Sequence, residues 1–312
     1  MSLANTVNPL FRYAILAATQ NRAVEGVVRS HGMQLGAARF VAGERFSDCA
    51  EVLASLDAKG LHTNTTVLGE SVEDQSTVDV VIESYLEILD QIAIRGLKTN
   101  IALKLTHLGL EIGEDLAYHS LARIVERAEQ HGNFIRIDME ESARVDATLS
   151  IYRKLRESGF TNVGTVLQSC LYRSESDLHA LMEYQPNLRL VKGAYLEPAD
   201  IAFPRKRDVD LNYLRLARYS LSHGEYTAIA THDERIINFV IEYTERNGIE
   251  RDRFEFQMLY GIRPEYQVEL ERQGYKVLVA TPYGPEWYYY LMRRLAERPA
   301  NLLFLIQNIL RR

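Results

Sequence analysis

The chain has 312 residues, of which 46% are hydrophobic and 25% are charged. This composition is typical of a soluble globular protein and excludes a disordered, collagen-like or coiled-coil chain. Lys and Arg number 36 against 42 Asp and Glu, and the net charge of -6 argues against nucleic acid as the main partner, because phosphate binding needs a cationic surface.

The cysteine content and the hydropathy bear on the compartment. Cys49 and Cys170 belong to no paired motif, so we expect no zinc cluster, no metal and no disulfide framework. No run approaches the ~20 apolar residues that span a bilayer. The apolar run at 13–18 is too short for a signal peptide. We therefore expect a cytoplasmic protein.

The first sixty residues carry helical patterns. One apolar face is formed by Leu10, Tyr13, Ala14 and Ala17. A second helix would be capped by Ser47 or Asp48 and would end at Gly60. We expect residues 1–60 to form an N-terminal helical segment.

After residue 60, short β-rich runs alternate with longer amphipathic stretches, and the runs start about 30 residues apart, the size of a βα unit. The runs are 63–68, 101–105, 134–139, 163–168, 189–192, 226–231, 254–258 and 275–280. Helices are predicted between them, for example at 79–96 and 115–132. Eight such units predict an α/β fold that closes into a (βα)8 barrel over residues 61–312, with an open doubly wound sheet as the alternative.

The glycines distinguish between classes of nucleotide-binding fold. No two glycines are separated by a single residue, so the G-x-G-x-x-G fingerprint of a Rossmann domain is absent. A Walker P-loop, a G-x-S-x-G elbow and an H-E-x-x-H motif are absent too. A cofactor held by one of these motifs is not expected.

Polar residues gather at the carboxyl ends of the predicted strands, where barrel enzymes place their catalytic groups. They are Lys104, Asp138, Gln168, Arg189, Lys192, Thr231, His232 and Gln257. Taken singly, Lys104 reads as a solvated or paired strand end, Asp138 as a helix cap and His232 as a hydrogen-bonded structural group. Together they indicate a site, since so many polar groups need partners or a ligand when buried.

The segment after the eighth run predicts a last helix with Pro285 in its first turn and Pro299 as its stop. Tyr290, Arg293 and Arg294 have the spacing of one helical face, which Glu297 would continue. Two guanidiniums beside a phenol would bind a carboxylate strongly; a solvated Arg-Glu face is the alternative.

Five strings in this chain resemble those of the proline dehydrogenase family, from about residue 10 to the end. They are VLQSCLYR at 166–173, LVKGAYLEP at 190–198, ATHD at 230–233, FEFQMLYG at 254–261 and YLMRR at 290–294. The likeness is to the short bacterial monofunctional form. It implies a distorted (βα)8 barrel with noncovalently bound FAD and no Rossmann domain.

The resemblance also implies roles for individual residues. Lys104, Tyr290, Arg293 and Arg294 would bind the substrate, Asp138 would hold this cationic cluster, and Arg189 would lie beside flavin N5. The FAD would be lined by Met139, Gln168, Arg189, Lys192, Gly193, Ala194, Thr231, His232 and Gln257. The chain departs from the family pattern at Ala280 and Cys170, where an aromatic residue is usual, and Ala280 would enlarge the pocket.

The activity implied is oxidation of L-proline to Δ1-pyrroline-5-carboxylate, with hydride transfer from C5 to flavin N5. The family usually passes its electrons to a membrane quinone, which implies peripheral contact with the inner membrane, although the sequence shows no basic amphipathic anchor. Two alternatives stay open: a flavin barrel of the methylenetetrahydrofolate reductase type, and a non-catalytic barrel that acts as an interaction protein.

Overall fold

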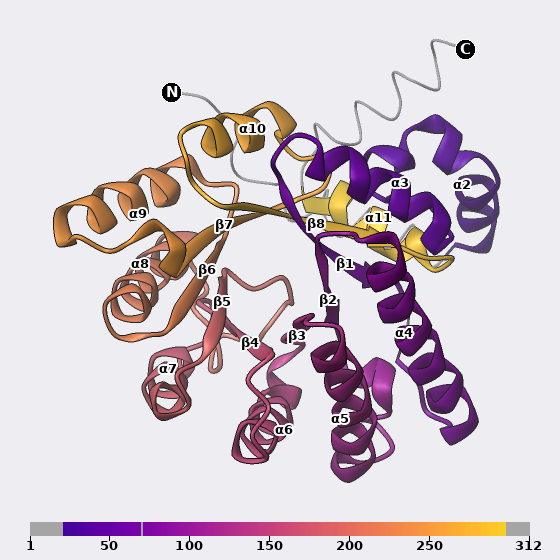
Figure 1. Ribbon diagram of the computed structural model, residues 1–312, viewed down its shortest axis with the longest axis horizontal. Helices are drawn as coiled ribbons and strands as arrows, with labels where there is room; N and C mark the ends of the chain where they lie inside the picture. The colour runs from indigo at the N-terminus through magenta and orange to yellow at the C-terminus, as the bar shows by residue number, and fades with distance from the viewer. Residues whose placement is uncertain (1–20, 70, 298–312) are drawn as a thin grey trace.

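The computed structural model describes residues 21–69 and 71–297, and its centre is a closed barrel of parallel strands (Figure 1). Each strand pairs with its neighbour in sequence, and β8 closes the ring against β1. The strands are β1 (His62–Val67), β2 (Thr99–Leu103), β3 (Ile135–Ile137), β4 (Val163–Gln168), β5 (Asn187–Val191), β6 (Tyr226–Ala230), β7 (Phe254–Leu259) and β8 (Val277–Tyr283). This topology confirms the predicted (βα)8 barrel and excludes the open doubly wound sheet.

Helices surround the strands and connect them (Figure 1). The α-helices are α2 (Arg22–Leu35), α3 (Phe46–Asp57), α4 (Gln75–Arg95), α5 (Glu114–Gln130), α6 (Val145–Glu157), α7 (Ser174–Leu181), α8 (Lys206–His223), α9 (Glu234–Asn247), α10 (Pro264–Arg272) and α11 (Trp287–Glu297). Short 3-10 turns are η1 (Ala37–Arg39), η2 (Leu105–Leu108), η3 (Ser142–Arg144), η4 (Met182–Tyr184) and η5 (Arg251–Arg253).

Helices α2 and α3 precede the barrel. α3 is the helix expected before Gly60, although it already ends at Asp57, and it places Cys49, Leu53 and Leu56 in the same apolar core as the strands. The apolar face predicted at residues 10–17 lies outside the described residues. The division of the chain at residue 60 stays a prediction.

The two faces of the strands differ in character. In β3, Ile135 and Ile137 are fully buried in the apolar core, while Arg136 between them belongs to the opposite face. In β1, Thr65 contacts Cys49 of α3, so its neighbour Asn64 faces the barrel interior. The interior therefore contains polar groups beneath the carboxyl ends of the strands.

Several predicted strand bounds are wrong, because backbone pairing and not hydrophobicity sets the limits. β2 starts at Thr99, whose register partner in β1 is Thr63. β8 runs on to Tyr283, which pairs with Val67. β5 runs from Asn187 to Val191, so Arg189 lies in the middle of the strand and not at its edge.

Helix starts needed correction too. α4 begins one turn earlier than predicted, because the Asp74 carboxylate accepts a hydrogen bond of 2.9 Å from the Thr77 N–H and caps the helix. α3 begins after Arg45, and Asp48 lies within its first turn, where its carboxylate accepts from the Arg45 N–H at 3.4 Å. Gly96 ends α4 as predicted, with the left-handed φ of 62° that glycine tolerates.

Candidate active site

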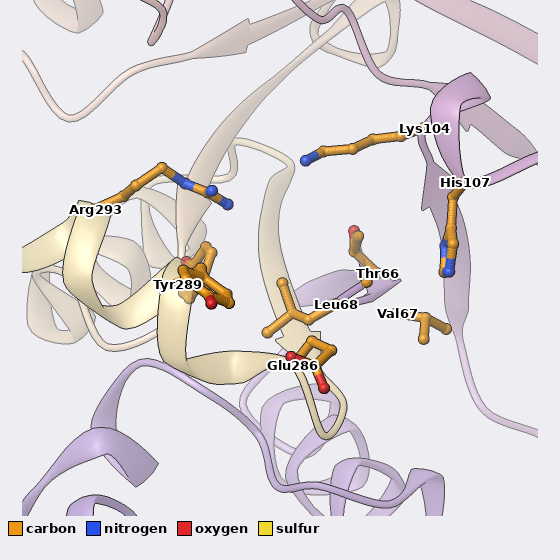
Figure 2. A pocket seen from close by; sticks show the side chains of 10 residues that line it. Thr66, Val67, Leu68, Lys104, His107, Glu286, Tyr289 and Arg293 are labelled. Atoms are coloured by element: carbon orange, nitrogen blue, oxygen red, sulfur yellow. The ribbon is translucent and has the colours of Figure 1, made fainter. Parts of the chain in front are cut away.

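A pocket lies between the ends of β1 and β2 on one side and α11 on the other (Figure 2). Its walls are Thr66, Val67, Leu68, Gly69, Lys104, His107, Glu286, Tyr289, Tyr290 and Arg293. Lys104 and Arg293 extend toward each other from opposite walls (Figure 2). Two converging cations suit a small carboxylate ligand.

Lys104 follows directly after β2 and precedes the 3-10 turn η2. The turn is held by Glu140, whose carboxylate accepts hydrogen bonds from the Thr106 N–H at 3.2 Å and the Thr106 hydroxyl at 2.7 Å. Burial raises the pKa of Glu140, although the Thr106 hydrogen bonds and the nearby Lys104 oppose the rise. Lys104 therefore stands at the start of a turn that the hydrogen bonds between Thr106 and Glu140 hold in place.

The α11 wall of the pocket is formed by Glu286, Tyr289, Tyr290 and Arg293, which have the i, i+3, i+4, i+7 spacing of one face. The sequence predicted a face shifted toward the C-terminus. Arg294 does not line the pocket; its guanidinium lies 5.3 Å from the centre of the Tyr290 ring.

The start of α11 also corrects a prediction. The helix begins at Trp287, so Pro285 precedes it and is not in its first turn. Pro299 and the side chain of Glu297 lie outside the described residues.

Asp138 and Arg189 form an ion pair across β4. Asp138 follows β3, and its Oδ1 lies 2.6 Å from Nη1 of Arg189, which comes from the middle of β5. Arg189 is 8% exposed, and its Nε and Nη2 are buried without a hydrogen-bond partner among the described residues. Since a buried donor left unpaired is costly, the geometry favours a ligand that accepts hydrogen bonds at this point.

A second guanidinium lies deeper in the barrel. Arg136 donates to the main-chain oxygens of Thr165 at 2.9 Å and Asn187 at 2.6 Å, and to the side-chain oxygen of Asn187. Gly164 makes room for it, because a Cβ there would come within 2.4 Å of Arg136 Nη1. Burial, with a further contribution from Arg189, lowers the pKa of Arg136 to about 9. Sequence reasoning missed this residue, since nothing in a three-residue strand shows which face is inside.

The predicted cofactor residues at β4 and β7 are buried amides with orienting contacts. Gln168 Nε2 donates to the Glu140 carbonyl oxygen at 2.8 Å, and Gln257 Nε2 donates to Glu255 Oε1 at 2.5 Å. The nearly buried Met139 lies between Asp138 and Glu140 in the chain. These contacts leave each amide oxygen to be used by another donor.

At the end of β6, Thr231 and His232 are oriented by main-chain groups. The Thr231 hydroxyl accepts from the Asp233 N–H at 3.1 Å, and His232 Nε2 accepts from the Leu259 N–H at 2.9 Å. His232 Nε2 is therefore unprotonated in this arrangement, and in the neutral ring Nδ1 carries the proton.

Lys192 is engaged by two carboxylates. Its Nζ lies 2.6 Å from Asp210 and 3.0 Å from Asp233. Hydrogen bonds from Arg235 and Lys192 hold the pKa of Asp233 below its usual range, although burial opposes the shift. The next residue, Gly193, has a φ of 105°, which favours glycine, and Ala194 is exposed. Lys192 is therefore paired with Asp210 and Asp233 within the protein, in addition to any contact with a cofactor.

Sequence reasoning also missed His107. It lies three residues after Lys104, in the same turn, and its Nδ1 is 3.3 Å from the hydroxyl of buried Tyr85. Burial, with a smaller effect of Lys104, lowers the pKa of His107 to about 4, so the ring is neutral near pH 7. The signal available in the sequence was a titratable side chain in the short turn that directly follows the strand end at Lys104.

A closed (βα)8 barrel with cations and a buried ion pair at the carboxyl ends of its strands is the architecture of a barrel enzyme acting on a small anionic molecule. Comparison with known proteins is more specific. The family model for proline dehydrogenase matches residues 49–307. The chain belongs to the proline dehydrogenase family.

Similar proteins agree with this assignment. Proline dehydrogenase of Deinococcus radiodurans is 42% identical over 98% of this chain and 99% of its own length. Proline dehydrogenase 1 of Bacillus subtilis is 41% identical over 97% of this chain and 100% of its own length.

Among solved structures, the crystal structure of proline utilization A from Bdellovibrio bacteriovorus, inactivated by N-propargylglycine, superposes with a TM-score of 0.81. The match covers 92% of this chain and 36% of that one at 23% identity, and it supports the fold.

Over residues 21–69 and 71–297, no helix has the length and apolar character needed to cross a bilayer. Nor do three His, Cys, Asp or Glu side chains of these ranges come together as a metal site.

Proposed function

We propose that this chain oxidises L-proline to Δ1-pyrroline-5-carboxylate, using noncovalently bound FAD as its cofactor and a quinone as the electron acceptor. The observation that carries the proposal is the buried Arg189 side chain. One nitrogen is paired with Asp138, and two further nitrogens have no partner among the described residues.

The donor set fits a flavin. A reduced flavin ring carries negative charge, and a guanidinium with unused N–H groups would stabilise that charge. The buried amides of Gln168 and Gln257 and the hydroxyl of Thr231 could hold polar edges of the same cofactor. When bound, the flavin would supply the two-electron acceptor that the protein side chains lack.

The protein residues would bind and orient the substrate. Lys104 and Arg293, from opposite walls of the pocket, would clamp the carboxylate of proline so that its ring has one orientation. Arg294, packed on Tyr290, would support the same wall, and Tyr290 would limit the space beside the ring.

The cations would also influence the protonation of the substrate. Positive charge close to the ring nitrogen disfavours the ammonium form and lowers the pKa of the amine. Arg136 and Arg189 bring two positive charges into the barrel interior. Asp138, which is paired with Arg189, would compensate part of the repulsion between them. A neutral amine has the free lone pair that the oxidation needs.

The test begins with the colour of the purified protein. We expect a yellow protein whose 450 nm absorbance is bleached by L-proline without NADH or NADPH, and whose flavin is released into the supernatant by acid. A flavin bleached only by NADH would favour a reductase of the methylenetetrahydrofolate type. A colourless protein that does not take up FAD would favour a non-catalytic barrel, and flavin retained on the precipitated chain would contradict noncovalent binding.

The acceptor is tested separately. Reoxidation of the proline-reduced protein by a water-soluble quinone, faster than by oxygen, would support a quinone partner. Cosedimentation with lipid vesicles would support a cytoplasmic protein that contacts the inner membrane peripherally. Absence of both would limit the proposal to proline oxidation.

A further inference from the structure

Arg29 of α2 makes a dense set of contacts with the start of α11, which lies next to α2 (Figure 1). Its Nη2 is 2.8 Å from Glu286 Oε2, its Nη1 donates to the Pro285 carbonyl at 3.0 Å, and its Nε is 2.8 Å from Glu25 Oε1. The guanidinium also lies over the Tyr289 ring, 5.9 Å from its centre. Arg29 thus bonds to Pro285 and Glu286, the two residues directly before α11.

The contact between the two helices is close, which fixes Arg29 relative to α11. A Cβ on Gly32, one turn after Arg29, would come within 2.7 Å of the Trp287 ring. The Trp287 Nε1–H donates to Glu44 Oε1 at 2.7 Å, so the indole is held from both sides. Arg29 therefore acts from a packed interface and not from a free surface.

Glu286 has an unfavourable charge for the pocket it lines. Its wall is shared with Arg293, and Lys104 faces them across the pocket. A free carboxylate there would repel an anionic ligand and would offer a competing partner to the two cations. Burial lowers the pKa of Arg29, but the hydrogen bonds to Glu25 and Glu286 outweigh it, so the guanidinium stays charged.

We propose that Arg29 is a positioning residue that sets the charge of the pocket: it neutralises Glu286 and keeps that carboxylate directed toward α2, so that Lys104 and Arg293 are available to the carboxylate of the substrate. The identity of this substrate rests on the proposed function. Loss of Arg29 then raises KM and leaves kcat nearly unchanged, because no reacting atom is touched.

The experiment compares Arg29→Met with the double variant Arg29→Met/Glu286→Gln in the flavin-loaded protein. We expect Arg29→Met to raise KM for L-proline at least about fivefold, with kcat within about twofold of wild type, and the increase to shrink in 0.5 M salt. The double variant should return KM to within about twofold of wild type, because the repelling charge is gone. Arg95→Met, at the far end of α4 and bonded only to Gln91 among the described residues, is the matched control.

An unchanged KM in Arg29→Met would overturn the proposal. So would a double variant worse than the single one, which would mean that Arg29 only tethers α11. Arg29→Lys keeps the positive charge but not the planar guanidinium with its several N–H donors, and it replaces Arg29→Met in the experiment if that variant does not fold. We expect its KM to be within about threefold of wild type, and a larger increase contradicts the charge argument. Calorimetric binding of cyclopentanecarboxylate, which has no amine to oxidise, separates the two proposals. Weaker binding by Arg29→Met supports the pocket charge even if wild type fails to oxidise proline, and equal binding refutes it.

Discussion

Replacing Asp138 by Asn tests the buried ion pair that orients Arg189. The two side chains are 10% and 26% exposed, and their charged atoms are 2.6 Å apart. Breaking a fully buried pair costs about 3–5 kcal/mol of folding free energy; since a quarter of Asp138 is accessible to water, we expect Asp138→Asn to lower the free energy of unfolding by roughly 2–3 kcal/mol. Because Arg189 also loses the partner that orients it, we expect kcat/KM for L-proline per bound flavin, measured with an artificial electron acceptor, to fall about a hundredfold, the scale on which an oriented transition-state donor contributes.

The matched control is Asp90→Asn. The Asp90 carboxylate lies 2.7 Å from both Arg127 and His131, but its side chain is 38% exposed. Exposed pairs contribute about 0–1 kcal/mol, so kcat/KM should stay within about twofold of wild type. If Asp138→Asn lowers kcat/KM no more than Asp90→Asn does, Arg189 needs no partner to take its position and the reasoning is refuted.

Three other sets of substitutions test the pocket, the barrel interior and the pH dependence of stability. Arg293→Met should lower kcat/KM for L-proline about a hundredfold or more while the flavin stays bound. Arg294→Met should lower it less, because this guanidinium packs on Tyr290 and does not line the pocket, and equal losses in the two variants would contradict this arrangement. Gly164→Ala should lower the free energy of unfolding by about 3 kcal/mol, because its Cβ would overlap the buried guanidinium. Gly26→Ala, with no atom within 4 Å of the new Cβ, should raise it by about 0.5–1 kcal/mol, and equal effects in urea unfolding would contradict the packing argument. The pKa of His107 falls from 6.5 in the unfolded chain to about 4 in the folded protein. Between pH 6.5 and pH 4 the unfolded chain therefore binds a proton that the folded protein does not, and the free energy of unfolding decreases as the pH is lowered through this range. Wild type should lose about 2–3 kcal/mol more than His107→Gln between pH 7 and pH 4.5; an equal loss would exclude His107 as the cause.

The sequence was sufficient to predict the barrel, because parallel strands are buried on both faces and read as short apolar runs with a regular spacing. β4 was predicted with its correct bounds, since all of its residues are buried. β2 was placed too late because its first residues, Thr99 and Asn100, are polar. Pairing with a neighbouring strand defines such residues as β, and a single sequence does not contain that information.

The candidate site was predicted in part for a similar reason. Carboxyl ends of parallel strands meet at one edge, so Lys104 and Asp138 could be found from their position in the chain. The pair of Asp138 and Arg189 joins residues 51 apart, and that of Arg29 and Glu286 residues 257 apart. Contacts at such separations follow from the closure of the barrel and the packing of α2, which periodicity does not show.

The contact between Gly164 and the Arg136 guanidinium has a consequence for how this barrel can change in evolution. A side chain at position 164 is excluded twice, because its Cβ would lie 2.4 Å from Arg136 Nη1 and also 2.4 Å from the main-chain oxygen of Asn187. Replacing Arg136 by a shorter residue removes only the first clash, since the second is with the backbone of the neighbouring segment. Homologous barrels with this backbone geometry should therefore keep glycine at 164 even where the arginine at 136 has been lost.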